Sequence, residues 1–91
     1  MDKVAHIIVQ GRVQGVGFRW FVQEVAEKMY LVGDVKNLPD RSVEIHVAGS
    51  EEDVELFLAR LRKGNHYSRV DKVQVDWEQS DDNWTTFKIL R

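Results

Sequence analysis

The stretch Gly11-Arg12-Val13-Gln14-Gly15-Val16-Gly17-Phe18-Arg19-Trp20 joins an apolar segment to a helical pattern through two closely spaced glycines. Glycine lets a turn adopt backbone angles that a Cβ forbids, so Gly15 and Gly17 predict a tight turn whose N–H groups can approach a ligand. The apolar residues that follow are spaced as one face of a helix: Phe18, Phe21, Val22, Val25, Ala26 and Met29. The helix is therefore expected to start directly at this turn.

The turn has the features of an anion site. The first N–H groups of a helix lack partners within the helix and lie at the positive end of the helix dipole. Arg19 adds a planar guanidinium whose donors match phosphoryl oxygens. On spacing alone, a turn that only packs remains an alternative. Nucleotide binding is not supported, because neither standard Gly-rich nucleotide signature is present.

The rest of the chain alternates strand and helix patterns. Val4 to Val9 is almost continuously apolar and predicts a central strand packed on both faces or nearly so. The first helix should end near Met29. Gly33 is then expected to mark the break before a second strand. The later expected elements are strand 34–38, turn 38–42, strand 43–47, a helix capped by Ser50, strand 73–77, turn 80–83 and strand 87–90. This order predicts an α+β sandwich, a mostly antiparallel sheet with two helices on one face.

Composition limits the class of protein. A chain of 91 residues with 43% hydrophobic content fits a single domain over residues 1–91, expected to be a monomer. The absence of cysteine fits a reducing compartment, and no apolar run reaches membrane-spanning length, so we expect a cytoplasmic protein without a signal peptide or membrane partner. The net charge of −2 counts against nucleic-acid binding and means that attraction for an anion must be local.

Taken as a whole, Gly11 to Arg19 resembles the signature of the acylphosphatases, small enzymes that hydrolyse the carboxyl–phosphate bond of acyl phosphates. A second block, Gly33-Asp34-Val35-Lys36-Asn37 with Val43-Glu44 after it, is similar to the other motif of that family, at the usual separation. The resemblance covers essentially the whole chain and implies a ferredoxin-like βαββαβ sandwich. One departure is the turn after Asn37, where Asp40-Arg41 stands in place of the usual Asp-Gly. Two alternatives follow: the turn has its usual shape and Arg41 is strained, or the turn has another geometry in which Arg41 is unstrained.

The resemblance also implies which residues form the site. The phosphoryl oxygens would be held by the backbone N–H groups of Gln14, Gly15, Val16, Gly17, Phe18 and Arg19. The catalytic residues would be Arg19, whose guanidinium binds the same group, and Asn37, whose amide orients the attacking water. Because an amide is a poor base, the proton of that water would pass to a phosphoryl oxygen of the substrate. No metal or other cofactor is expected, and inorganic phosphate or sulfate should compete with the substrate.

Other residues could suggest other chemistry. The chain has three histidines, His6, His46 and His66, and three tryptophans, Trp20, Trp77 and Trp84. His6 and His46 can face the same side of the sheet, but without acidic or thiolate partners at ligand spacing we expect no metal site. Trp77 has the parity of a core residue, so packing in the core or at its rim is favoured over base stacking. Without the resemblance, Arg19 would be expected to pair with a helix neighbour, and Asn37 to form a turn.

Two alternative functions remain. The first is a non-catalytic module of the same fold that binds a phosphorylated or nucleic-acid ligand. RNA-binding sheets use exposed aromatic residues on central strands, and the segments 4–9 and 43–48 contain none. The second is a domain of a larger enzyme that handles carbamoyl phosphate. Turnover of benzoyl phosphate separates these possibilities.

Overall fold

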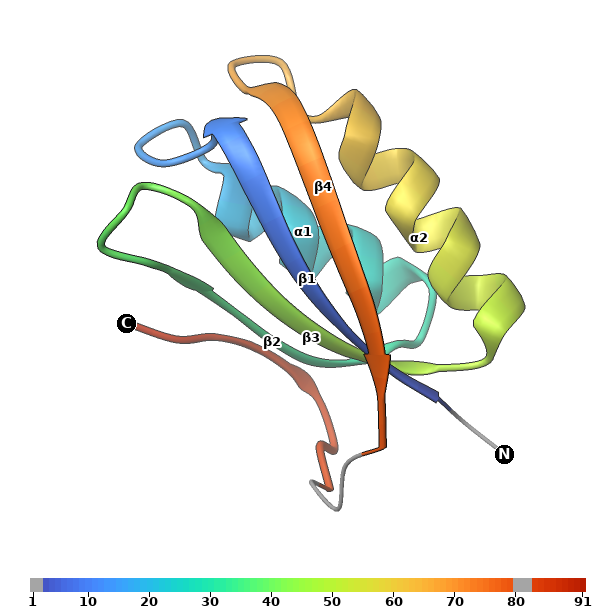
Figure 1. Cartoon of the computed structure of the whole chain (residues 1–91). Coiled ribbons are helices and arrows are strands. Elements are labelled where there is room, and N and C mark those ends of the chain that lie inside the picture. Colours follow the sequence, from blue (N-terminus) through green and yellow to red (C-terminus); the bar gives the residue numbers. More distant parts are fainter. Residues whose placement is uncertain (1–2, 80–82) are drawn as a thin grey trace.

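The computed structural model describes residues 3–79 and 83–91 as one five-stranded sheet with two helices on one face (Figure 1). The elements are β1 (Lys3–Arg12), α1 (Phe18–Lys28), β2 (Val32–Asn37), β3 (Val43–Gly49), α2 (Glu51–Lys63), β4 (Arg69–Glu78) and β5 (Phe87–Ile89). The strand order is β4-β1-β3-β2-β5, antiparallel except between β2 and β5. The predicted α+β, ferredoxin-like fold is confirmed.

The core lies between the sheet and the two helices. Alternate residues of β1 and β3, such as Ile7 and Ile45, point toward the helices and are fully buried. The helices bury the predicted apolar stripes, which are Phe18, Val22, Val25 and Ala26 in α1 and Val54, Phe57, Leu58 and Leu61 in α2. This packing fixes where α1 begins relative to the ends of β1 and β2.

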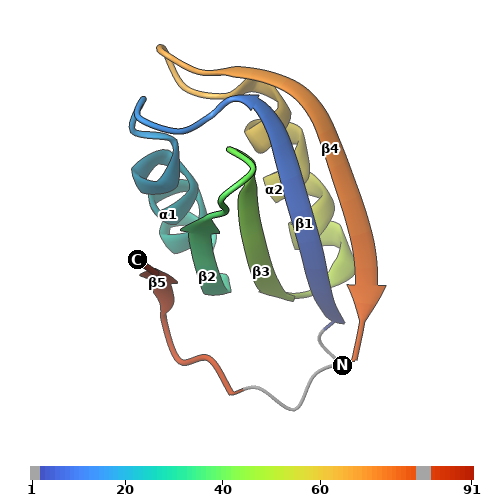
Figure 2. The ribbon, with the colours of Figure 1, turned by 60° about the vertical axis from the view of Figure 1, so that its left-hand side comes forward.

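The opposite face of the sheet is not covered by the helices (Figure 2). The prediction that Val4 to Val9 packs on both faces is therefore wrong. Ala5 and Ile7 are fully buried against the helices, whereas His6 and Ile8 on the other face are only half-buried. Ile8 lies between Glu44 on β3 and Gln74 on β4, because β1 is a central strand, and it is therefore only partly exposed. We call this surface the open face.

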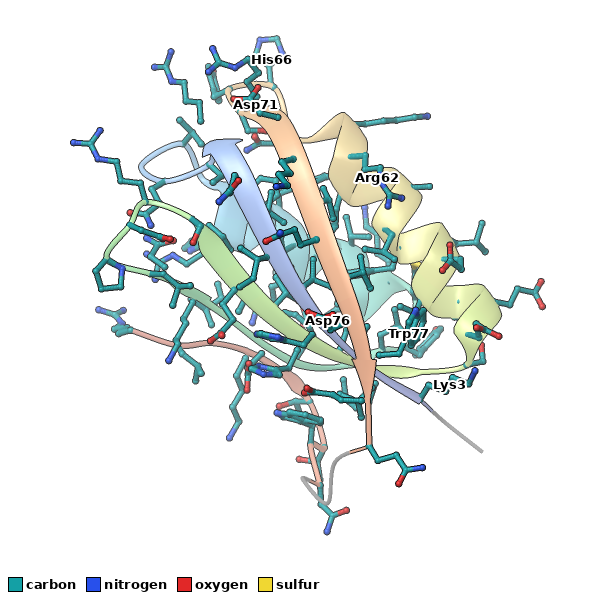
Figure 3. All side chains as sticks on the ribbon, in the orientation of Figure 1. Lys3, Arg62, His66, Asp71, Asp76 and Trp77 are labelled. Atoms are coloured by element: carbon teal, nitrogen blue, oxygen red, sulfur yellow. The ribbon has the colours of Figure 1, made fainter. Side chains whose placement is uncertain are left out.

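One further prediction differs from the structure. Gly33 lies within β2 instead of before it, and glycine is needed there because a Cβ would clash with the His46 carbonyl oxygen on β3. Trp77 is 39% exposed near the end of the edge strand β4, with the Lys3 ammonium 5.8 Å from its ring, so it packs at the rim of the core (Figure 3). The turn expected at 80–83 lies mostly outside the described residues.

The turn between β2 and β3 has the first of the two expected geometries, with Arg41 in a strained backbone conformation. The Arg41 N–H donates to the Leu38 carbonyl at 3.1 Å, and the Leu38 N–H donates to the Ser42 carbonyl at 2.9 Å. Arg41 has a φ of 76°, in the left-handed region that favours glycine. The Asp40 carboxylate accepts hydrogen bonds from the Ser42 hydroxyl and N–H, which lower the pKa of Asp40. The hairpin is thus held together around one residue with an unfavourable backbone angle.

Replacing Arg41 by glycine should stabilise the protein. A left-handed backbone costs a residue with a Cβ about 1–2 kcal/mol, and the greater freedom of glycine in the unfolded chain offsets part of this. We expect Arg41→Gly to gain about 0.5–1 kcal/mol, which raises the melting temperature by roughly 2–8 °C for a domain of this size. Arg41→Lys keeps the Cβ and the charge and should melt like the wild type. A lower melting temperature in Arg41→Gly would contradict the strain.

Candidate active site

The loop between β1 and α1 has the predicted tight turn. Gly15 and Gly17 have φ angles of 73° and 75°, both left-handed. A Cβ on Gly15 would meet nothing within 4 Å, so this glycine is needed for its backbone angle, and the space beside it is open. The loop therefore presents its backbone to an approaching ligand. We call residues 14–19 the cradle.

The two helices begin differently. The N-terminus of α2 is satisfied within the chain, because the Ser50 hydroxyl accepts a hydrogen bond from the Asp53 N–H at 3.2 Å and acidic residues fill the first turn. The N-cap of α1 is Gly17, which provides no side-chain acceptor, and its first turn contains no acidic residue. Among the residues that the structure describes, no side chain caps the start of α1, so its positive end is open to an acceptor.

The Gln14 side chain joins the cradle to the hairpin that carries Asn37. Its Nε2 donates to the carbonyl oxygens of Leu38 at 2.9 Å and Ser42 at 2.8 Å. These two carbonyls belong to residues on opposite sides of the hairpin turn, so one amide fixes the turn against the loop. The sequence indicated only the backbone N–H of Gln14, because the partners of its side chain are 24 and 28 residues away.

Asn65 supports the cradle from the connection between α2 and β4. Its Nδ2 donates to the Val16 carbonyl at 2.9 Å, and its own N–H donates to the Ser68 hydroxyl at 2.8 Å. From the sequence, Asn65 is expected only to end a helix. A residue 49 positions from Val16 gives no local signal of this contact.

Arg19 is the second residue of α1 and is half-buried. Its Nη1 donates to the Leu90 carbonyl at 3.1 Å, and the Leu90 N–H donates to the Val35 carbonyl on β2 at 2.8 Å. Within residues 3–79 and 83–91, no carboxylate forms an ion pair with Arg19. The alternative of a pair with a helix neighbour is thus not seen, and a guanidinium with five N–H donors keeps donors for a ligand.

Asn37 ends β2 with its side chain on the helix side of the sheet, the side that buried Val35 also faces. The Asn37 Oδ1 is buried and has no hydrogen-bond partner among the described residues. Buried polar atoms are nearly always paired, so this acceptor is available to a small polar partner. This oxygen can accept a hydrogen bond from a water.

A depression of about 370 Å³ adjoins the cradle. Its lining residues are Gly11, Arg12, Val13, Gln14, Gly15 and Arg41. The side chains of Arg12 and Arg41 are exposed and supply local positive charge on a chain whose net charge is −2. This agrees with the expectation that attraction for an anion is local.

Comparison with known proteins identifies the family. The family model described as Acylphosphatase matches residues 5–89. The chain belongs to the acylphosphatase family. An acylphosphatase from Bacillus licheniformis is 47% identical over 83 residues, which are 91% of this chain and 92% of that protein. The crystal structure of acylphosphatase from Bacillus subtilis superposes with a TM-score of 0.94 at 41% identity and covers both chains completely.

The acylphosphatase fold also occurs inside a larger protein. The crystal structure of HypF from T. kodakarensis matches with a TM-score of 0.87 at 40% identity, covering 98% of this chain and 12% of that one. The curated relatives, by contrast, are of similar length to this chain, because the match covers 92% of the Bacillus licheniformis protein. The resemblance found in the two sequence motifs is confirmed at the level of the family.

Removing the Gln14 clamp should lower activity without removing a cradle N–H. In Gln14→Leu the Leu38 and Ser42 carbonyls lose their donor, so Asn37 is held less firmly. We expect kcat to fall about 10-fold or more, since small misplacements of a catalytic group are costly, and stability to fall by about 1 kcal/mol. Gln74→Leu, on the open face, should retain wild-type kcat. Wild-type kcat and melting temperature in Gln14→Leu would contradict the clamp.

Proposed function

We propose that the cradle, Arg19 and Asn37 form the active site with which this member of the acylphosphatase family hydrolyses acyl phosphates to a carboxylate and inorganic phosphate. The observation that carries the proposal is the uncapped N-terminus of α1, which opens at a left-handed glycine turn. The Gln14 amide ties the hairpin of Asn37 to the same loop. The donors to the phosphoryl group and the acceptor for the water would thus be held in place by one connected set of contacts.

The phosphoryl group would be held mainly by backbone. The N–H groups of residues 14–19 would donate to its oxygens. The Arg19 guanidinium, which also donates to the Leu90 carbonyl, would bind the same group. In phosphoryl transfer the charge is spread over the three equatorial oxygens, so donors already in place stabilise the transition state without reorganisation. Inorganic phosphate and sulfate would occupy the same cradle and compete.

The attacking water would be positioned by Asn37. Its unpaired Oδ1 would accept one hydrogen bond from the water and aim the water oxygen at phosphorus, in line with the leaving carboxylate. The carboxylate is a good leaving group and departs without a general acid. The water proton passes to a phosphoryl oxygen, because an amide cannot act as a base. The products are one carboxylate and one inorganic phosphate.

This mechanism needs no metal ion, since backbone N–H groups and Arg19 supply the positive field that a cation would otherwise provide. We further propose that residues 1–91 act as a single domain, a monomer in the cytoplasm without nucleic-acid or membrane partners. No helix within residues 3–79 and 83–91 is long and apolar enough to cross a membrane.

The proposal is tested by comparing two classes of phosphate substrate. Purified protein should hydrolyse benzoyl phosphate, with or without EDTA, but not ethyl phosphate, whose alkoxide leaving group needs an acid that the site lacks. A non-catalytic binding module would bind inorganic phosphate and leave benzoyl phosphate intact. Comparable rates on both substrates, or activity that EDTA abolishes and a metal restores, would overturn the mechanism.

Substitution separates the roles of the two side chains. Arg19→Lys replaces a fork of donors by a point charge, so kcat/KM should fall about 10²–10³-fold, with a higher KM and a lower kcat. Asn37→Ala should lower kcat about 100-fold and change KM little, because only the water loses its partner.

The matched controls are Arg62→Lys and Asn83→Ala, at exposed positions that are not part of the cradle. They should keep wild-type kinetics, and all four variants should keep the wild-type circular dichroism spectrum. Near-normal kcat in a folded Asn37→Ala would remove the water-positioning role from this residue.

A further inference from the structure

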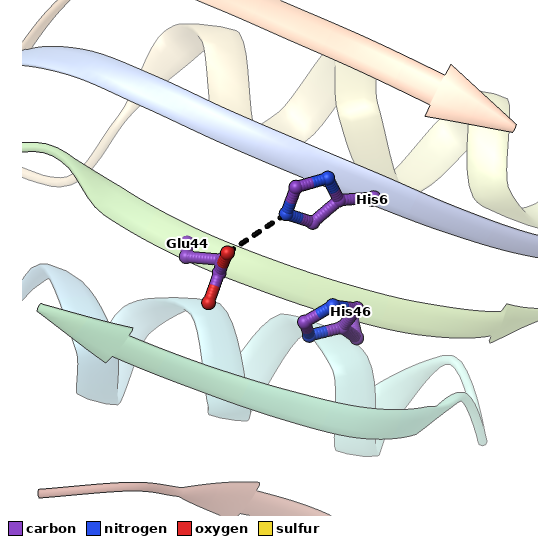
Figure 4. A group of neighbouring side chains, drawn as sticks. All are labelled: His6, Glu44 and His46. Atoms are coloured by element: carbon purple, nitrogen blue, oxygen red, sulfur yellow. Dashed lines mark hydrogen bonds and ion pairs between the residues drawn. The ribbon is translucent and has the colours of Figure 1, made fainter. Parts of the chain in front are cut away.

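Two histidines and a glutamate meet on the open face of the sheet (Figure 4). His6 on β1 lies directly opposite His46 on β3, with ring centroids 4.8 Å apart, and Glu44 is two residues from His46 on the same strand. The His6 Nε2 lies 2.8 Å from Glu44 Oε2. The prediction that these histidines lack acidic partners is wrong, because the pairing of β1 with β3 supplies one that the sequence spacing does not show.

A second carboxylate orients one of the imidazoles. The Asp34 Oδ1 on β2 lies 3.0 Å from His46 Nδ1, and Trp84 Nε1 donates to Asp34 Oδ2 at 3.0 Å. Because a carboxylate accepts, this contact places the His46 proton on Nδ1 and leaves a lone pair on Nε2. Histidines that bind metals almost always donate their other N–H to such an oxygen.

We propose that His6, Glu44 and His46 form a binding site for a divalent transition-metal ion of the Zn²⁺ class. Two imidazoles and one carboxylate are a ligand set that Zn²⁺ uses with a water in the fourth position, and imidazole selects against Mg²⁺ and Ca²⁺. Asp34 is then the positioning residue of His46. The site is independent of the proposed hydrolysis.

To coordinate an ion, the three side chains must rotate, and the hydrogen bond that His6 Nε2 donates to Glu44 must break. One ligand atom from each of the three residues lies within 4.8 Å of the others. With metal–ligand bonds of about 2.1 Å in a tetrahedral site, these atoms must converge to about 3.4 Å. Both rings are half-exposed, at 26% and 28%, so they can turn out of their stack without repacking the core.

The charges around the cluster favour a cation. Asp76 lies opposite His6 on β4 (Figure 3). Against the carboxylates of Asp34, Glu44 and Asp76 stand two ammonium groups, Lys36, 3.7 Å from Glu44, and Lys88, opposite Asp34 on β5. The balance is negative by one charge.

Calorimetric titration of tag-free protein with Zn²⁺ tests the site. We expect one saturable ion per chain and no saturable binding of Mg²⁺. His6→Gln or His46→Gln should weaken Zn²⁺ binding about 100-fold or more, and Asp34→Asn about 10-fold, as outer carboxylates typically do. His66→Gln is the matched control, because His66 is exposed at the other end of the molecule, before β4 begins (Figure 3).

Two further measurements make the result independent of folding defects. Cu²⁺ should quench the emission of Trp84, whose ring lies 6.0 Å from His46, and Trp84→Phe should remove that quenching. The His6 and His46 variants should retain turnover of benzoyl phosphate, since the open face lies across the sheet from Asn37. Absence of saturable Zn²⁺ binding, equal binding by both histidine variants and wild type, or loss of binding in His66→Gln would overturn the proposal.

Discussion

The first N–H groups of α1 need acceptors, and the described part of the chain provides no side-chain cap for them. At the start of α2 the same requirement is met by Ser50 and by three acidic residues in the first turn. The difference lies in the local sequence, since Gly17 and Phe18 stand where α2 has a hydroxyl and a carboxylate. An anion at α1 would satisfy groups that are otherwise left to solvent.

The contacts around this helix end come from distant segments. Gln14 ties the loop to the hairpin of β2 and β3, Asn65 ties it to the connection before β4, and Arg19 is held by the Leu90 carbonyl. The hairpin keeps Arg41 in a left-handed conformation. A site that relies on backbone needs this kind of support, because a loop alone does not hold N–H groups in a fixed direction.

The sequence was sufficient to predict the fold and the glycine turn of the cradle, because the signals for both are local. Helix stripes, the Ser50 cap and the glycine pair each appear within a few residues, and the alternation in β3 predicts a half-buried strand. The partners of the Gln14 and Asn65 side chains could not be found, because they lie 24 to 49 residues away. The cluster of His6 with Glu44 depends on strand register, which no single segment shows. The apolar run in β1 did not indicate that only one face of this strand is covered by the helices.

The cradle is tested most directly by following backbone amide signals of ¹⁵N-labelled protein during titration with inorganic phosphate. The signals of residues 14–19 should shift along one saturation curve, while those at the start of α2, whose N-terminus is already capped, should stay in place. The Arg19→Lys variant should show the same set of shifting amides at higher phosphate concentration. Saturable phosphate binding that leaves the amides of residues 14–19 unshifted would contradict a backbone phosphate site.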